Sequence, residues 1–380
     1  MLTSLETLQE KNLIRKRICN EPIKDLLVKF DGKTCRNFTS NDYLGLSKHP
    51  EVISGCKQGF DHYGFGSGAS PLVSGYTQAQ KDLEQQFADL VNRPAALFFN
   101  SGYQANTALM QCFGNKDTLV IADKFIHASL LDGLSLSKSK LKRFPHLDLA
   151  SAELFLSSAD ASMTKILLSE SIFSMEGDIA DIEQLIHLSK KHNAALFLDD
   201  AHGFGVLGKN GLGICNINET GCNDIRLLST PLGKAVGGIG AVISGSKQDI
   251  EYLLQFARSY RYSTALPPAL AVGLSKSLAL LATESWRREK LFENINLFIN
   301  QINKTDLQLI SDDITPIKSI LIGDNRKAEN LQQKLLELGF FVSCIRPPTV
   351  PENTARLRVT LNALHQKEDI IQLVTNLKAL

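Results

Sequence analysis

Short apolar runs alternate with amphipathic stretches over much of this chain, and this alternation is what most constrains its fold. The apolar runs span residues 95–99, 118–122, 165–169 and 195–198, and the amphipathic stretches between them include 81–92, 103–113 and 182–192. Continuous apolar strands separated by amphipathic helices are typical of a mostly parallel sheet that is covered on both faces. We therefore expect an α/β fold built around such a sheet.

Polar clusters follow four of these apolar runs. They occupy residues 100–106, 123–127, 169–175 and 199–202. Because ligands of parallel sheets lie beyond the carboxyl ends of the strands, these clusters are expected to meet at one edge of the sheet. The convergence of four clusters indicates a binding site more strongly than any single cluster does.

The remainder of the chain suggests further parts around this sheet. Residues 1–20 are predicted to form a helix and 26–40 a hairpin around Asp31-Gly32, while Leu266-Pro267-Pro268 interrupts the chain. A long helical stretch over 269–303 and a second alternating pattern follow. The second pattern has strands at 318–322, 341–345 and 356–360 and helices at 326–337 and 367–377. We expect an amino-terminal arm (1–45), a large domain (46–268) and a smaller carboxy-terminal α/β domain (269–380).

Composition favours a soluble protein that acts on small molecules. The 380 residues carry a formal net charge of +1, which provides no field to attract nucleic acid or an anionic membrane. The seven cysteines are scattered and form no CxxC pair, as in a reduced, cytoplasmic protein. The amino terminus is charged and amphipathic, unlike a signal peptide, and no apolar run approaches the roughly twenty residues of a membrane-spanning helix.

Lys234 lies in a glycine-rich turn about thirty residues after the motif Asp199-Asp-Ala-His202, which itself ends an apolar strand. Pyridoxal phosphate chemistry requires such a set: an amine to bind the aldehyde, and a carboxylate to keep the pyridine nitrogen protonated. Taken singly, Lys234 is more commonly a solvated amine, and Asp199 and His202 are more commonly structural. Their combination favours catalysis.

Other motifs are weaker by themselves. Gly102, in Asn100-Ser-Gly-Tyr-Gln-Ala-Asn106, opens a predicted helix whose free amides can bind a phosphate, and Tyr103 could lie over an aromatic ring. A nicotinamide site is disfavoured because GxGxxG is absent. A Walker loop is excluded because Gly233-Lys234 precedes alanine. The chain also lacks the HExxH and G-x-S-x-G motifs of zinc proteases and hydrolases.

Together these motifs resemble the α-oxoamine synthases, a family of fold-type-I pyridoxal phosphate enzymes. The resemblance covers nearly the whole chain from about residue 10. Its motifs are Asn41-Asp-Tyr-Leu-Gly-Leu, Gly66-Ser-Gly, Val73-Ser-Gly-Tyr, His127-Ala-Ser-Leu, Phe173-Ser-Met-Glu-Gly-Asp, Asp199-Asp-Ala-His-Gly, Leu232-Gly-Lys-Ala and Tyr262-Ser-Thr. It implies a transferase with a large domain, a smaller carboxy-terminal domain and a homodimeric assembly.

The resemblance also implies roles for individual residues. Lys234 would form the Schiff base, Asp199 would pair with the pyridine nitrogen, His202 would bond the phenolic oxygen, and His127 would stack on the ring. The other cofactor-binding residues would be Gly102, Tyr103, Ser174 and, from the neighbouring subunit, Thr264. The residues that meet substrate would be Arg15, Asn41, His127, Arg346, Thr349 and Arg358.

Two positions depart from the family pattern. Relatives usually carry a phosphate-binding threonine three residues before the lysine, where this chain has Pro231. Thr230 or Ser229 is expected to take over that hydrogen bond. Gln80 stands where relatives often have histidine, and we expect it to be structural.

Within the family, Ile345-Arg-Pro-Pro-Thr-Val-Pro and Thr354-Ala-Arg-Leu-Arg favour the members that condense L-alanine with a pimeloyl thioester in biotin biosynthesis. The closest alternative is a glycine C-acetyltransferase, and members that use succinyl-CoA, or a long-chain acyl-CoA with serine, are further ones. A non-catalytic protein of the same fold is disfavoured because Lys234, Asp199 and His202 are all present. The sequence leaves open whether CoA or acyl carrier protein carries the acyl group.

Overall fold

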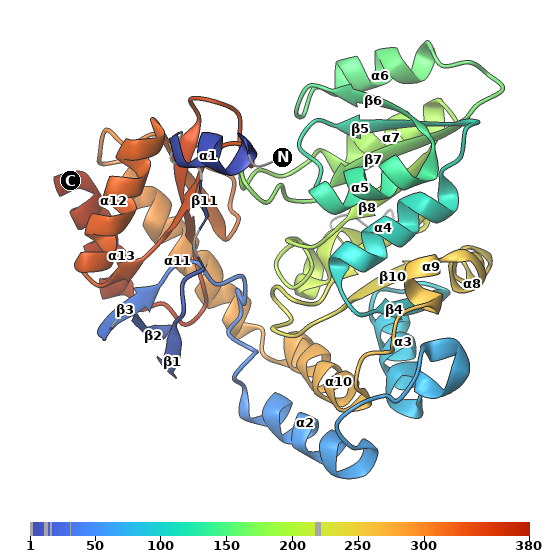
Figure 1. The fold of residues 1–380 in the computed structure, drawn as a ribbon, viewed down its shortest axis with the longest axis horizontal. Coiled ribbons are helices and arrows are strands. Elements are labelled where there is room, and N and C mark those ends of the chain that lie inside the picture. Colours follow the sequence, from blue (N-terminus) through green and yellow to red (C-terminus); the bar gives the residue numbers. More distant parts are fainter. Residues whose placement is uncertain (1–2, 11–13, 16, 31, 217–221) are drawn as a thin grey trace. The chain divides into compact units, whose positions relative to one another are not determined.

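A computed structural model describes residues 3–10, 14–15, 17–30, 32–216 and 222–380 of the chain (Figure 1). The chain divides into two compact units. The larger unit comprises residues 46–173 and 179–285. The smaller unit comprises 1–45, 174–178 and 286–380, so the short segment Ser174–Asp178 belongs with the two ends of the chain.

A mostly parallel sheet forms the centre of the larger unit, which confirms the predicted fold class. Within the described residues its order is β4-β10-β9-β8-β7-β5-β6, and only β10 runs against its neighbours. The strands are β4 (Ala95–Phe99), β5 (Thr118–Asp123), β6 (Lys140–Phe144), β7 (Thr164–Glu170), β8 (Ala195–Asp199), β9 (Leu227–Pro231) and β10 (Ala241–Gly245). The apolar-run pattern identified β4, β5, β7 and β8 and missed the other three.

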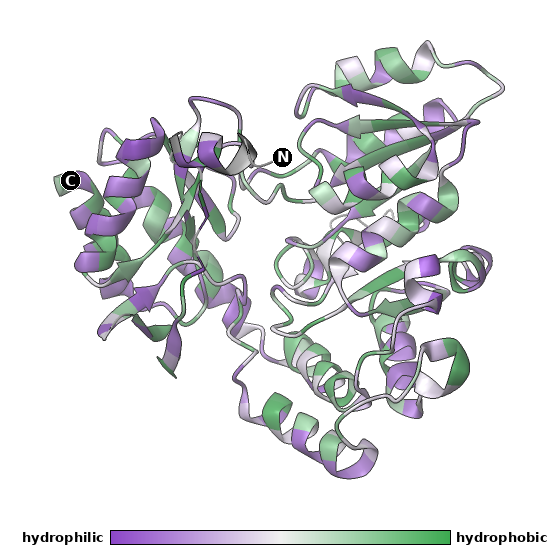
Figure 2. Cartoon of the chain, in the orientation of Figure 1, coloured by the Kyte–Doolittle hydropathy of each residue, from purple (hydrophilic) through white to green (hydrophobic). Residues whose placement is uncertain are grey.

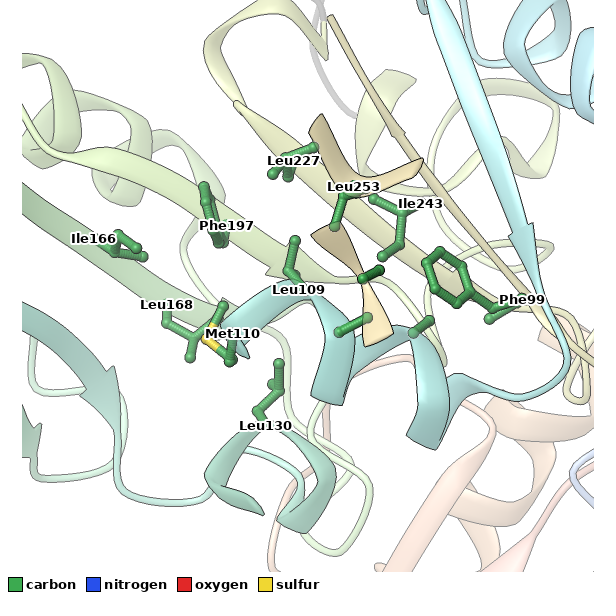
Figure 3. Packing of buried hydrophobic residues seen from close by; sticks show 14 of the residues in the cluster. Phe99, Leu109, Met110, Leu130, Ile166, Leu168, Phe197, Leu227, Ile243 and Leu253 are labelled. Carbon is green, nitrogen blue, oxygen red and sulfur yellow. The ribbon is translucent and has the colours of Figure 1, made fainter. Parts of the chain in front are cut away.

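Burial explains why these runs form inner strands. Every residue of β5 is buried, whereas four of the five residues of β6 are exposed. Figure 2 shows the same contrast, with the inner strands mainly hydrophobic and β6 hydrophilic. Alternate residues such as Phe99, Phe197 and Ile243 join side chains of α4 and α5 in one apolar cluster (Figure 3). The buried apolar surface on this face is the main stabilising term of the unit.

Helices cover both faces of the sheet. Helices α4, α5 and α8 contribute to the cluster of Figure 3, while α3 packs on β4 and β10, α6 on β5 and β6, and α7 on β8. The helices of the unit are α2 (Pro50–Tyr63), α3 (Gln78–Leu90), α4 (Gly102–Phe113), α5 (Ala128–Ser137), α6 (Leu149–Ser157), α7 (Ile182–Lys191), α8 (Lys247–Phe256), α9 (Arg258–Arg261) and α10 (Pro268–Thr283). Four single turns complete it: η1 (Pro71–Gly75), η2 (Lys209–Gly211), η3 (Gly213–Asn216) and η4 (Cys222–Asp224).

Helix α10 belongs to the larger unit, although the expected small domain began at residue 269. The reason is its close packing on α2. A Cβ on Gly59 would lie 2.5 Å from Cα of Ala269, and a Cβ on Gly273 would lie 2.2 Å from Sγ of Cys56. The expected single helical stretch over 269–303 is also divided, because α10 ends at Thr283 and α11 begins at Trp286.

The smaller unit contains two small sheets, ordered β1-β2-β3-β12 and β11-β14-β13 among the residues that the structure describes. Its elements are α1 (Thr3–Glu10), β1 (Glu21–Lys24), β2 (Leu27–Phe30), β3 (Lys33–Asn37), α11 (Trp286–Ile302), β11 (Ile317–Gly323), α12 (Asn325–Glu337), β12 (Phe340–Phe341), β13 (Ser343–Ile345), β14 (Ala355–Thr360) and α13 (Lys367–Ala379). The predicted hairpin is present as β2 and β3, although Asp31 of its turn lies outside the described residues.

Helix α1 is shorter than the helix expected over residues 1–20. Its described part ends at Glu10, and the described residues from Ile14 to Asn20 have no regular structure. Ile14 and Ile18 instead line a cavity of the smaller unit, so their apolar side chains are used for packing outside a helix. Within the described ranges, no helix combines the length and apolarity that crossing a membrane requires.

The buried Glu84 makes the stability of the larger unit depend on pH. Its carboxylate accepts hydrogen bonds from the Tyr76 hydroxyl (2.5 Å) and the Phe98 amide (2.8 Å), yet burial raises the pKa of Glu84 to about 7. The unfolded chain loses this proton at lower pH than the folded chain. The contribution of Glu84 is therefore complete below its ordinary pKa of 4.5 and declines as pH rises to about 7.

We predict that Glu84→Gln makes the free energy of unfolding less dependent on pH between 5 and 7, because an amide does not ionise. The expected difference in slope is up to about 1.4 kcal/mol per pH unit. Urea unfolding across this pH range measures it, with the exposed Glu251→Gln on α8 as the control. Equal slopes for the Glu84→Gln variant and the unsubstituted chain would contradict the prediction.

Candidate active site

A cavity of about 270 Å³ lies in the larger unit at the carboxyl ends of the parallel strands. Polar clusters after β4, β5, β7 and β8 contribute to its wall, as the sequence predicted. Six residues singled out in the sequence line this cavity: Gly102, Tyr103, His127, Asp199, His202 and Lys234. The fold thus brings together residues that lie up to 132 positions apart along the chain.

The amino end of α4 forms one wall of the cavity. Ser101 caps the helix by accepting a hydrogen bond from the Gln104 amide (3.1 Å), so the helix offers the amides of Gly102 and Tyr103 to an external acceptor. Gly102 lies against the Pro231 ring: a Cβ there would be 2.8 Å from Pro231 Cγ. Free amides and the helix dipole together suit a phosphate group.

Asp199 ends β8 and is almost completely buried at 3% exposure. Its Oδ1 accepts a hydrogen bond from the Ala201 amide (2.9 Å), and its Oδ2 accepts one from Nδ2 of Asn106 (2.6 Å). Burial raises the pKa of Asp199, and the Asn106 hydrogen bond is the largest influence that opposes the rise. A buried carboxylate of this kind favours a cationic ligand, since a positive charge offsets the loss of water.

His127 and Lys234 complete the set around Asp199. His127 caps α5, where its Nδ1 accepts a hydrogen bond from the Ser129 amide (3.2 Å), and its ring is exposed. Lys234 is half-buried in the turn after β9, and its carbonyl accepts a hydrogen bond from the Gly237 amide (2.8 Å). His202 is buried and lies on the cavity wall.

Three residues expected at the cofactor do not line this cavity: Thr230, Thr264 and Ser174. Thr230 is fully buried in β9, and Pro231 lines the cavity instead. Successive side chains of a strand point to opposite faces, so a strand that directs Pro231 to the cavity directs Thr230 away from it. The expectation was that Thr230 or Ser229 replaces the missing threonine; Ser229 is also fully buried in β9, and neither residue lines the cavity. Thr264 is exposed, and its carbonyl accepts a hydrogen bond from the Asn100 side chain (2.6 Å).

Three expected substrate-binding residues line a second cavity, of about 890 Å³, in the smaller unit. They are Arg15, Arg346 and Thr349. Arg15 donates a hydrogen bond from Nη2 to the Thr349 hydroxyl (2.8 Å), and Arg346 forms an ion pair with Glu329. Apolar side chains, among them Phe30 and Leu336, line the same cavity.

Arg358, Asn41 and Ser174 meet elsewhere in the smaller unit. Arg358 is buried at 6% exposure and donates hydrogen bonds to the Ser174 carbonyl (2.8 Å) and to Oδ1 of Asn41 (3.3 Å). The neighbouring Arg356 forms a buried ion pair with Glu176 at 2.9 Å. These bonds attach the segment Ser174–Asp178 to β14, which explains why it belongs to this unit.

Sequence reasoning assigned no site role to ten other residues of the cavity wall, among them Asn106, Ser129, Glu170 and Pro231. Three of these four have a signal in their position. Asn106 lies four residues after Gly102, and therefore on the same side of α4, while Ser129 follows His127 by two residues in the first turn of α5. Glu170 ends β7 in the position next to Asp199.

Comparison with known proteins identifies the family. A model of the family described as aminotransferase class I and II matches residues 33–377. The 8-amino-7-oxononanoate synthase of Saccharophagus degradans is 46% identical over 340 residues, which are 90% of this chain and 85% of that protein. The chain belongs to the aminotransferase class I and II family.

Comparison with solved structures leads to the same family. An 8-amino-7-oxononanoate synthase from Francisella tularensis matches with a TM-score of 0.80 and 36% identity, over 90% of this chain and 96% of that one. A serine palmitoyltransferase variant from S. paucimobilis, solved with pyridoxal phosphate and myriocin bound, matches with a TM-score of 0.94 and 25% identity, over 100% and 96%. These matches confirm the α-oxoamine synthase resemblance and the pyridoxal phosphate cofactor.

The residues of the cavity fit this cofactor. The amides of Gly102 and Tyr103 suit its phosphate, the buried Asp199 carboxylate suits a protonated ring nitrogen, and Lys234 on the same wall would supply the amine. Pro231 has no donor to offer. The phosphate would therefore be held mainly by the amino end of α4, where Pro231 and Gly102 are in contact.

This contact makes Gly102 sensitive to any side chain. We predict that Gly102→Ala weakens pyridoxal phosphate binding at least about tenfold, because the new Cβ displaces the helix end from the Pro231 ring. The combined Gly102→Ala and Pro231→Ala variant removes Cγ of the ring and is expected to recover part of the affinity. Titration of the cofactor-free protein with pyridoxal phosphate measures both, with Pro231→Ala as the control. Equal losses for the single and combined variants would contradict the steric explanation.

Proposed function

We propose that this chain condenses L-alanine with a pimeloyl thioester to form 8-amino-7-oxononanoate, a free thiol and carbon dioxide, as a step of biotin biosynthesis in the cytoplasm. A carbon–carbon bond forms between Cα of alanine and the acyl carbon, the carbon–sulfur bond breaks, and the alanine carboxyl group leaves. The observation that carries the proposal is the meeting of Lys234, Asp199 and His202 in one cavity, beside the amino end of α4. Near full-length similarity to 8-amino-7-oxononanoate synthases supports it.

Bound pyridoxal phosphate supplies an electron sink for the negative charge that develops on the amino acid. In the proposed reaction, Lys234 would hold the cofactor through its aldehyde and would accept the proton from Cα of alanine. Asp199 would keep the ring nitrogen protonated, so that the sink remains effective. His202 would hydrogen-bond the phenolic oxygen, and His127 would stack on the ring.

The smaller unit is proposed to bind the rest of the substrates. Arg358 would hold the alanine carboxylate, with Asn41 beside its guanidinium. The cavity that contains Arg15, Arg346 and Thr349 combines cationic groups with apolar side chains such as Phe30, Leu336 and Phe341. This combination suits a pimeloyl group, which has an apolar chain and a terminal carboxylate.

A homodimer is also part of the proposal. The segment around η1 carries exposed apolar side chains, with Phe65 at 89% and Val73 at 80%, and Tyr262 beside Thr264 is 67% exposed. Hydrogen bonds from the Ala265 amide to the Ala69 carbonyl (2.9 Å) and from the Ser67 hydroxyl to the Ala265 carbonyl (2.6 Å) place these segments side by side. Apolar side chains this exposed favour burial by another copy of the chain.

The proposed function predicts that carbon dioxide is released from carboxyl-labelled L-alanine only when a pimeloyl thioester is present. Lys234→Ala should abolish this release, since no other lysine is among the described residues that line the cavity. Borohydride reduction of the loaded protein should attach the cofactor to the peptide that contains residue 234. Release with glycine and acetyl-CoA, and not with alanine, would indicate the acetyltransferase alternative. Cofactor attachment elsewhere would overturn the proposal.

We predict that Val73→Glu converts the dimer into monomers, because a buried charge at an apolar interface is unfavourable. Light scattering coupled to gel filtration measures the mass. Leu154→Glu on α6 is the control, because Leu154 is 64% exposed on a different element. A monomeric mass for the unsubstituted chain would contradict the dimer.

A further inference from the structure

A chain of hydrogen bonds connects two parts of the cavity wall that the proposed mechanism treats separately. Asn106 lies on α4 at 1% exposure, and its Nδ2 donates both to Oδ2 of Asp199 (2.6 Å) and to the Ser129 hydroxyl (3.0 Å). Ser129 is completely buried, and its Oγ lies 2.8 Å from Nδ1 of His127. Four side chains from α4, α5 and β8 thus form one connected path.

The donors along this path can be assigned from the chemistry of each group. The Ser129 amide donates to Nδ1 of His127 (3.2 Å), so this nitrogen carries a lone pair. The Ser129 hydroxyl accepts a hydrogen bond from Asn106 and donates its own hydrogen to the same lone pair on Nδ1 of His127. The His127 ring is therefore held with its proton on Nε2, and its rotation is restricted by two donors from one residue.

At the other end, Asn106 fixes Asp199. The amide gives both of its Nδ2 hydrogens to the path, while its Oδ1 has no partner among the described residues. The two hydrogen bonds that Nδ2 donates therefore fix the orientation of the Asn106 amide. The Asn106 hydrogen bond favours the ionised form of Asp199 and opposes the effect of burial on its pKa. An ionised Asp199 is the form that pairs with a protonated ring nitrogen.

We propose that Asn106 and Ser129 are positioning residues that orient His127 and Asp199 as a unit around the cofactor ring. Asn106 restricts the rotation of the Asp199 carboxylate, which would pair with the ring nitrogen, and Ser129 restricts the rotation of the His127 ring, which would stack on the cofactor. This inference rests on the proposed function for the catalytic roles of His127 and Asp199. The hydrogen bonds of the path are formed by the protein's own side chains and do not require the cofactor.

The first test measures cofactor affinity and colour without any substrate. Asn106→Leu, which keeps the approximate shape and removes both donors, is expected to raise the Kd for pyridoxal phosphate about 10- to 100-fold, as expected for loss of a hydrogen bond to a charged group. The pH at which the visible band of the bound cofactor changes should also shift. A Kd within threefold of that of the unsubstituted chain and an unchanged titration would overturn the role of Asn106.

The matched control is Thr107→Val. Thr107 is the next residue of α4, and its hydroxyl donates to the Ser129 carbonyl (3.4 Å) instead of to the Ser129 side chain. This variant removes a hydrogen bond between the same two helices and leaves the path intact. It should keep the Kd and the spectral titration, and losses equal to those of Asn106→Leu would show a merely structural effect and overturn the proposal.

Ser129→Ala tests the connection to His127 and provides a milder substitution if Asn106→Leu does not fold. In the cofactor-free protein, nitrogen NMR of the His127 ring should show protonation on Nε2 for the unsubstituted chain. Ser129→Ala keeps the amide donor of residue 129 and loses the hydroxyl donor, so it should show a smaller share of that tautomer. An unchanged share would overturn the path. Because this measurement uses neither cofactor nor substrate, its outcome is separate from that of the proposed reaction.

Combining the two substitutions tests whether the residues act as a unit. In a connected path, Ser129→Ala should add little to the loss of cofactor affinity that Asn106→Leu already causes, because the bridge to His127 has been broken. Losses that multiply would show independent contributions and overturn the coupling. The release of carbon dioxide from alanine is recorded in parallel, so failure of the proposed function leaves a distinct pattern: normal cofactor binding with no release.

Discussion

The burial of a carboxylate at the end of β8 is the constraint on which the larger unit depends. Asp199 is 3% exposed, and burial alone would favour its neutral form. The fold opposes this with the Asn106 hydrogen bond and the Ala201 amide, and it leaves a cavity on the same side into which a cationic ring fits. Both hydrogen bonds favour the ionised form of this carboxylate and oppose the rise in its pKa that burial causes.

Strand direction explains how the other groups reach it. Strands β4, β5, β7, β8 and β9 run in the same direction, so each delivers the residues that follow it to the same edge. The amino end of α4 lies against Pro231, where a side chain on Gly102 has no room. The site therefore depends on packing between α4 and the end of β9 as much as on its polar groups.

In the smaller unit, two arginines of β14 bind the segment Ser174–Asp178. Arg358 and Arg356 hold the segment Ser174–Asp178 through its carbonyls and through Glu176. Gly177 has a positive φ of 80°, and a Cβ there would lie 2.2 Å from the Ile317 carbonyl, so only glycine allows this approach. A segment from the middle of the chain is thereby incorporated into a unit built mainly from its two ends.

The sequence by itself determined the mostly parallel sheet and the edge at which the cavity lies, because continuous apolar strands need cover on both faces and their polar ends must meet at one edge. Asp199, His202 and Gly102 were recognisable for that reason, and Lys234 was recognisable from its glycine-rich turn. Tertiary structure alone decided that Thr230 does not line the cavity, that Asn106 and Ser129 join Asp199 to His127, and that α10 belongs to the larger unit. These outcomes depend on strand alternation, side-chain orientation and contacts between residues far apart in the chain, which no local pattern contains.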